Sequence, residues 1–128
     1  MGTWRIQIVD KDRTAAQITR RGIACALGSA ADVRVALSAN DAWLACTRGD
    51  VDLLIVDPTP NDVAALGLIR ALRHYRNPVQ LLVLTAYDTP GLRSAMRRFG
   101  VKSYAAKPIE LRDLLPSIRH QLQELHDA

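Results

Sequence analysis

Apolar and polar positions alternate regularly along this chain, with short apolar runs separated by longer amphipathic stretches. The apolar runs predict strands over residues 5–9, 32–37, 52–56, 79–84 and 103–106. The amphipathic stretches predict helices over 13–27, from Ser38 or Asn40 to 48, and over 62–75, 90–99 and 111–125. This strand–helix alternation predicts an α/β fold: a doubly wound, five-stranded parallel sheet in order 2-1-3-4-5, with helices on both faces.

Several helix ends are marked by residues that favour them. Asp12 is a suitable N-cap for the first helix, and Gly28 marks its C-terminal end. Pro90 is a favourable first residue for the fourth helix. Pro116 lies inside the last predicted helix, so we expect that helix to kink or to start late.

The chain of 128 residues has the length of one domain, so we expect residues 1–128 to form a single domain. Apolar residues make up 48% of it, enough for a core. Because no apolar run approaches the roughly 18 residues of a membrane span and no secretory signal pattern precedes the first strand, we expect a cytoplasmic protein without membrane contact. Cys25 and Cys46 lack metal-ligand spacing, and we expect both to be reduced and buried.

The net charge of +4 raises the alternative of a nucleic-acid-binding module. However, the basic residues are spread along the chain, and only Arg20-Arg21 and Arg97-Arg98 are adjacent. The few aromatic residues do not cluster into a platform on which bases could stack. Nucleic acid is therefore not the partner that we expect for this domain.

Polar residues follow the apolar runs at four of the predicted strand ends. Asp10, Asp57, Thr85 and Lys107 close the first, third, fourth and fifth strands. Ligands of open α/β sheets bind at the carboxyl ends of the strands, and these four strands are neighbours in the predicted order. Each residue alone is explained as well by a turn or by the surface, but the agreement of all four indicates one site.

A carboxylate, a hydroxyl and an ammonium at one sheet edge suit phosphoryl transfer to a carboxylate. Aspartate can act as a nucleophile that forms an acyl phosphate. Neighbouring carboxylates attract a hard cation such as Mg²⁺, and a lysine and a hydroxyl can hold the phosphoryl oxygens. Other α/β chemistries are disfavoured, because the chain has no phosphate-binding glycine loop, no dinucleotide fingerprint and no nucleophile elbow.

With these residues in view, the chain resembles the receiver domains of bacterial two-component response regulators over nearly its whole length. The segment ending in Asp10, the run from 52 to Asp57, Leu84-Thr85-Ala86 and the segment 104–108 resemble the family's motifs in order and spacing. The resemblance implies a flavodoxin-like three-layer sandwich and a signalling phosphoacceptor that is not itself an enzyme. It also implies that the Lys107–Pro108 peptide bond is often cis.

The resemblance assigns roles to the matching residues. Asp57 would accept a phosphoryl group from a histidine kinase or phosphotransfer protein. Thr85 and Lys107 would bind that group, and Tyr104 would swing inward behind Thr85. The signalling face would be the fourth helix, fifth strand and fifth helix, for which the candidates besides Tyr104 are Arg93, Met96, Arg97 and Arg112.

The family's metal site is changed in this sequence. The expected Mg²⁺ ligands are Asp10, Asp57 and the backbone carbonyl of Thr59, but the second acid that normally follows the first strand is Lys11 here. Asp12 is an additional candidate ligand if the strand end bulges. Lys11 either stands in for the cation beside Asp57 or points to solvent.

The loop after Asp57 departs from the family as well. Its proline, Pro60, comes three positions after the aspartate rather than four, and no acid–glycine pair follows. These changes leave a second interpretation open, a pseudo-receiver that acts as a phosphorylation-independent interaction or dimerisation module. Either a homodimer or a fused or separate effector domain is compatible with the sequence.

Overall fold

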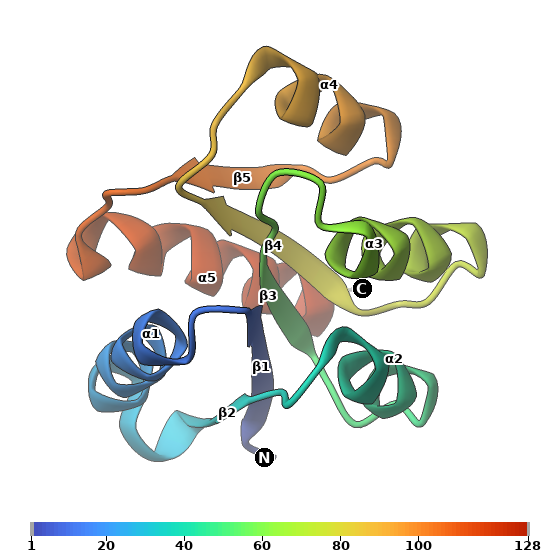
Figure 1. Ribbon diagram of the computed structural model, residues 1–128. Helices are drawn as coiled ribbons and strands as arrows, with labels where there is room; N and C mark the ends of the chain where they lie inside the picture. Colours follow the sequence, from blue (N-terminus) through green and yellow to red (C-terminus); the bar gives the residue numbers. More distant parts are fainter. Residues whose placement is uncertain (1, 128) are drawn as a thin grey trace.

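One five-stranded parallel sheet organises the protein, and the computed structural model describes residues 2–127 of it. The strands run in the order β2-β1-β3-β4-β5 (Figure 1), which confirms the predicted topology. Their bounds are β1 (Trp4–Asp10), β2 (Ala31–Val35), β3 (Leu53–Asp57), β4 (Gln80–Thr85) and β5 (Ser103–Ala106).

Helices cover both faces of this sheet. They are α1 (Arg13–Leu27), α2 (Ala39–Thr47), α3 (Val63–His74), α4 (Pro90–Arg98) and α5 (Leu111–Asp127), with a short 3-10 turn η1 (Gly28–Ala30) after α1. Helices α1 and α5 lie on one face, and α2, α3 and α4 lie on the other (Figure 1). The result is the three-layer sandwich that the sequence pattern predicts.

Strand β3 lies at the centre and contributes to both cores. Leu54 and Val56 pack against the α2–α3–α4 side, whereas Leu53 and Ile55 pack against the α1–α5 side, and all four are at most 1% exposed. Burial of each such side chain stabilises the fold by about 1.5–3 kcal/mol. This double burial explains why the sequence of β3 is continuously apolar rather than alternating, and it fixes Asp57 rigidly at the strand's end.

Capping side chains set the helix starts. The carboxylate of Asp12 accepts a hydrogen bond from the Ala15 amide, as expected for an N-cap. Ser38, rather than Asn40, caps α2. Gly28 ends α1 with a positive φ of 56°, a conformation that favours glycine.

Some local predictions are corrected by the structure. The second strand ends at Val35, and Leu37 is 74% exposed because the chain has already turned toward the start of α2. Helix α5 begins at Leu111 and continues through Pro116, so the late start is wrong. Cys25 is exposed on α1, contrary to expectation, whereas Cys46 is buried, and burial raises the pKa of its thiol to about 11.

Two further features concern the backbone and the surface. The Lys107–Pro108 peptide bond is cis, as the family resemblance implied. Within residues 2–127, no helix is both long enough and apolar enough to cross a bilayer.

Candidate functional site

Backbone pairing brings the four strand-end residues to one edge of the sheet. Asp10 and Asp57 are directly paired in the register of β1 and β3. Thr85 ends β4, and its carbonyl accepts a 2.7 Å hydrogen bond from the amide of Lys107, just after β5. The parallel order therefore places two carboxylates, a hydroxyl and an ammonium on adjacent strands, as the sequence predicts.

Three of these side chains form an ionic cluster. The Lys107 ammonium donates to Asp57 Oδ2 and lies 3.3 Å from Asp10 Oδ2. The side chains of Asp10 and Asp57 are only 5% and 9% exposed. Since one ammonium serves two buried carboxylates, the cluster retains one uncompensated negative charge.

Burial and the charged neighbours together set the direction of the pKa shifts of Asp57 and Lys107. Burial raises the pKa of Asp57, Lys107 opposes the rise, and the nearby Asp10 carboxylate reinforces it. Burial alone would lower the pKa of Lys107, but its contacts with Asp57 and Asp10 outweigh this effect and raise it. Lys107 therefore stays charged at neutral pH, and the cluster favours additional positive charge or an electrophile.

One carboxylate oxygen in this cluster is left without a partner. Asp57 Oδ1 is buried and accepts no hydrogen bond from any residue that the structure describes. An unsatisfied buried acceptor costs free energy, so it calls for an explanation, such as a reactive role or a bound ion. Here the free oxygen belongs to Asp57, the residue that the family resemblance predicts to be the phosphoacceptor.

Lys11 takes a position that the sequence did not suggest. Its ammonium lies 3.4 Å from Asp62 Oδ1, rather than beside Asp57 or in solvent alone. Asp62 is almost fully buried and caps α3 through the Ala65 amide at 3.1 Å. The sequence offered one clue to Asp62, an acid at the start of a helix, but its pairing with Lys11 depends on the fold.

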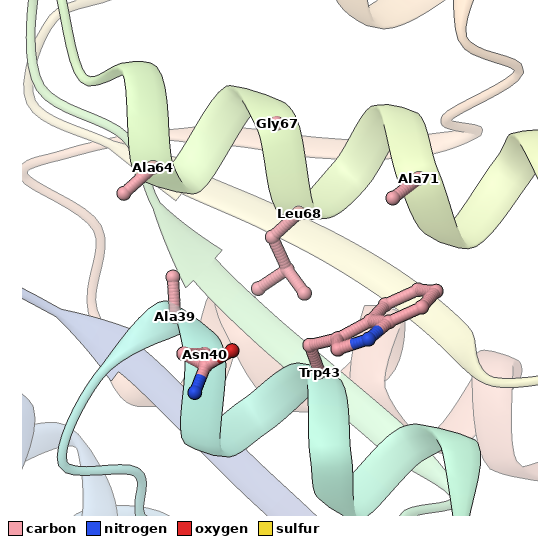
Figure 2. A pocket seen from close by; sticks show the side chains of 7 residues that line it. All are labelled: Ala39, Asn40, Trp43, Ala64, Gly67, Leu68 and Ala71. Carbon is pink, nitrogen blue, oxygen red and sulfur yellow. The ribbon is translucent and has the colours of Figure 1, made fainter.

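A cavity of about 250 Å³ opens over this cluster. Its charged lining residues come from the ends of β1 and β3 and from the start of α3; they are Asp10, Lys11, Asp57 and Asp62. A different hollow, of about 350 Å³, lies between α2 and α3, where Trp43 and Leu68 face small side chains (Figure 2). None of the residues lining that hollow is titratable, whereas the cavity at the strand ends is lined by acidic and basic side chains.

The other expected metal ligands are engaged elsewhere. The Asp12 carboxylate caps α1, and the Thr59 carbonyl accepts a 3.1 Å hydrogen bond from the Asp62 amide. Both oxygens of Asp10 already have donors, Lys107 and the amide of Asp12. Throughout the described part of the chain, no three His, Cys, Asp or Glu side chains are placed to share a metal ion. This donor set does not fit a magnesium site, which needs several oxygen ligands free to face the ion.

Thr85 is directed toward the loop that follows β3. Its hydroxyl is fully buried, donates to the Pro58 carbonyl at 3.0 Å and accepts from the Tyr87 amide at 2.9 Å. Thr85 therefore links the loop after Asp57 with the loop before α4, and its hydroxyl bonds to neither carboxylate oxygen of Asp57.

Tyr104 is held at the surface by a residue that the sequence did not single out. Its hydroxyl donates to Asp88 Oδ1 at 3.0 Å, and Asp88 accepts two 2.6 Å hydrogen bonds from Arg93. The Arg93 guanidinium also lies 4.9 Å from the centre of the Tyr104 ring. Burial and the Asp88 contact raise the pKa of Tyr104 to about 12.

The remaining candidates for the signalling face differ in exposure. Arg97 is exposed on α4, and Arg112 is exposed and lies 2.7 Å from Glu110. Met96 is only 1% exposed, because it belongs to the core between α4 and the sheet. Met96 therefore supports this face from beneath and is not a surface contact.

Comparisons with known proteins agree with this architecture. Residues 6–119 match the family model described as response regulator receiver domain. The response regulator MprA of Mycobacterium leprae is 31% identical over 93% of this chain and 51% of its own length. The DNA-binding transcriptional regulator NtrC of Azospirillum brasilense is 27% identical over 95% of this chain and 25% of its own length. The chain thus spans about half or less of these relatives.

Solved structures show the same fold. A CheY-like receiver domain protein from Methanospirillum hungatei superposes with a TM-score of 0.85 at 23% identity, covering 98% of both chains. A response regulator from Burkholderia pseudomallei, solved with a phosphorylated aspartic acid, a calcium ion and citrate, gives a TM-score of 0.76 at 22% identity over 97% of this chain and 71% of its own. With the family model matching most of its length, the chain belongs to the response regulator receiver domains of two-component signalling systems.

Proposed function

We propose that Asp57 accepts a phosphoryl group from the phosphohistidine of a histidine kinase or a phosphotransfer protein. The observation that carries this proposal is the unpartnered, buried Oδ1 of Asp57, beside an ammonium that neutralises Oδ2. A response regulator with the same fold carries a phosphorylated aspartic acid. Asp57 ends the central strand and borders an open cavity, so a donor group can reach it from the strand ends.

In the proposed step, a carboxylate oxygen of Asp57 bonds to phosphorus as the bond from phosphorus to the donor imidazole nitrogen breaks. The electron pair of that bond stays on the imidazole, which takes up a proton. Lys107 stabilises the charge that develops on the phosphoryl oxygens. Phosphorylation adds about −1.5 to −2 charges, and the Thr85 hydroxyl could then exchange its bond with Pro58 for one with the phosphoryl group.

Receiver domains generally bind Mg²⁺ at their acidic pocket, and this chain departs from that pattern. We propose that its magnesium affinity is weak, because Lys11 replaces an acid and Asp10 is already paired with Lys107. The Lys11 ammonium borders the same cavity as Asp57 and supplies positive charge there. Phosphoryl transfer to Asp57 then depends on the positive charges of Lys107 and Lys11 more than on a bound Mg²⁺.

Incubation with acetyl phosphate, followed by intact-mass measurement, tests this function. We expect one acid-labile phosphoryl adduct on the wild type, and none on Asp57→Asn. Asp41→Asn is the matched control, because Asp41 is exposed on α2, and it should keep the adduct. The proposal fails if the wild type gains no adduct with or without Mg²⁺, or if Asp57→Asn gains it equally.

A second candidate function is a phosphorylation-independent interaction module. The Lys11–Asp62 pair favours it, since it places a cation where the family normally has an acid. In that case Asp57→Asn would bind its partners as the wild type does. We also propose that residues 1–128 act together with an effector part. Longer relatives such as MprA, of which this chain covers about half, favour that arrangement.

A further inference from the structure

We infer that Asp62 is a positioning residue for phosphoryl transfer, because it holds the Lys11 ammonium at the cavity that Asp57 borders. Held there, Lys11 provides a fixed positive charge in a pocket whose donor set does not fit Mg²⁺. The inference rests on the proposed function and deepens it. It gives Asp62 a role in the transfer, and it makes the transfer independent of a divalent cation.

Asp62 is a rigid anchor for a cation. It is only 2% exposed, and both of its carboxylate oxygens are held by nearby backbone amides. Its Oδ1 accepts a 3.1 Å hydrogen bond from Ala65 in the first turn of α3, and its Oδ2 accepts a 3.4 Å hydrogen bond from Thr59. The carboxylate is therefore fixed in the loop that begins just after Asp57.

The charge of Asp62 is not needed for its cap. Asparagine is as favourable an N-cap as aspartate, because either side-chain oxygen can accept the amide hydrogen bond. A buried carboxylate costs more free energy than a buried amide unless a positive charge lies beside it. Lys11 provides that charge at 3.4 Å, so the pair connects the loop after β1 to the loop after β3.

Lys11 keeps the capacity to bind a second anion. Its side chain is 64% exposed, and it lines the same cavity of about 250 Å³ as Asp57 and Asp62. Among residues 2–127, Asp62 is the one polar partner of its ammonium. An ammonium carries three N–H donors, so donors remain for the oxygens of a phosphoryl group that arrives at Asp57.

The charge balance around Asp57 shows why this cation matters. Without Lys11, three carboxylates, those of Asp10, Asp57 and Asp62, would face the single ammonium of Lys107. An anionic phosphoryl donor would then be repelled from the cavity. An ammonium anchored at the cavity reduces this repulsion and needs no metal ligands.

Acetyl phosphate provides a donor for a direct test. A carboxylate oxygen of Asp57 bonds to phosphorus as the bond from phosphorus to the acetyl oxygen breaks, and acetate leaves with the electron pair. In this step Lys11 stabilises charge on the phosphoryl oxygens and forms no covalent bond.

The experiment measures, by intact mass, the rate at which the full chain gains the adduct in EDTA and in Mg²⁺. We expect the wild-type rate in EDTA to lie within about threefold of its rate in Mg²⁺. In EDTA, Lys11→Gln should react about tenfold more slowly, and Lys11→Arg should recover most of the rate. Asp62→Asn, which keeps the cap, should react about fivefold more slowly, because Lys11 is then no longer anchored.

A double variant separates positioning from a structural effect. If Asp62 acts through Lys11, Asp62→Asn should cause no further loss of rate in the Lys11→Gln background. Lys102→Gln is the matched control, because it removes the same charge from an exposed position before β5 and should react as the wild type does. Should Asp62→Asn fail to fold, the rates of Lys11→Gln and Lys11→Arg decide the question.

Three results would overturn the inference alone. They are a wild-type rate in EDTA more than about threefold below that in Mg²⁺, a Lys11→Gln rate equal to that of the wild type, and an equal loss from Asp62→Asn with and without Lys11. Absence of the adduct from every protein, in EDTA and in Mg²⁺, would instead overturn the proposed function on which the inference rests.

Discussion

At the scale of single residues, the site depends on a lysine shared between two buried carboxylates. Lys107 neutralises one negative charge, while Asp10 and Asp57 carry two. A buried ion pair contributes little net stability, but removal of one partner leaves an uncompensated charge. The cluster is therefore not a major source of stability, and we attribute it to the proposed phosphoryl transfer to Asp57.

We predict that Lys107→Met destabilises the protein by about 1–3 kcal/mol at pH 7, because two carboxylates then lie adjacent without a cation. In that variant the folded-state pKa of Asp57 rises further above its unfolded value, since Lys107 no longer lowers it. The folded variant then binds protons more readily than the unfolded chain. Its deficit relative to wild type should shrink as the pH falls from 7 to about 5. Urea unfolding at both pH values measures the free energy of unfolding, and the conservative Lys107→Arg is the control. An equal loss of unfolding free energy at pH 7 and at pH 5 would contradict the prediction.

At the scale of elements, the loop between β3 and α3 shows what the sequence could and could not predict. The strand ending in Asp57 and the helix after it follow from local patterns, because burial and helical periodicity are encoded in adjacent residues. The contact between Lys11 and Asp62 is not predictable in this way, since it joins two loops through the fold. The role of Asp88 is not predictable from the sequence for the same reason. Its partners Arg93 and Tyr104 come together only when α4 packs beside β5.

The buried position of Asp62 makes its cap more important than that of Asp12. We predict that Asp62→Ala lowers the free energy of unfolding by about 2 kcal/mol, whereas exposed Asp12→Ala lowers it by about 1 kcal/mol or less. Lys11→Gln should cost less than about 1 kcal/mol, because Lys11 is largely exposed in its pair. Thermal and urea unfolding of the three variants checks the ranking. Equal losses for Asp62→Ala and Lys11→Gln would show that the ion pair, and not the cap, accounts for the effect.

At the scale of the whole molecule, the receiver fold is retained while its acidic pocket is altered. The predicted strand order and both helical layers are confirmed, and the chain belongs to the family by its match over residues 6–119. The changed residues lie in the two loops that follow β1 and β3, and the hydrophobic cores on either side of the sheet are intact. The fold therefore tolerates a change of pocket chemistry without a change of architecture.

Restoring the family's acid tests this separation between fold and pocket. We predict that Lys11→Asp binds Mg²⁺ at least about tenfold more tightly than the wild type, because it exchanges a cation for an oxygen ligand beside Asp10. Calorimetric titration with magnesium measures the affinity, and Lys102→Asp provides the same charge change on a distant surface. Tight magnesium binding by the unmodified protein would contradict the account of the pocket given above.

The most direct test of the central claim is to locate the phosphoryl group itself. After incubation with a phosphorylated histidine kinase, borohydride reduction converts an aspartyl phosphate to homoserine, which peptide mass spectrometry assigns to one position. We predict homoserine at residue 57 alone, and none after prior acid hydrolysis or in Asp57→Asn. Homoserine at another aspartate, or its absence from residue 57 under conditions that label a control receiver, would contradict the assignment of Asp57 as the phosphoacceptor.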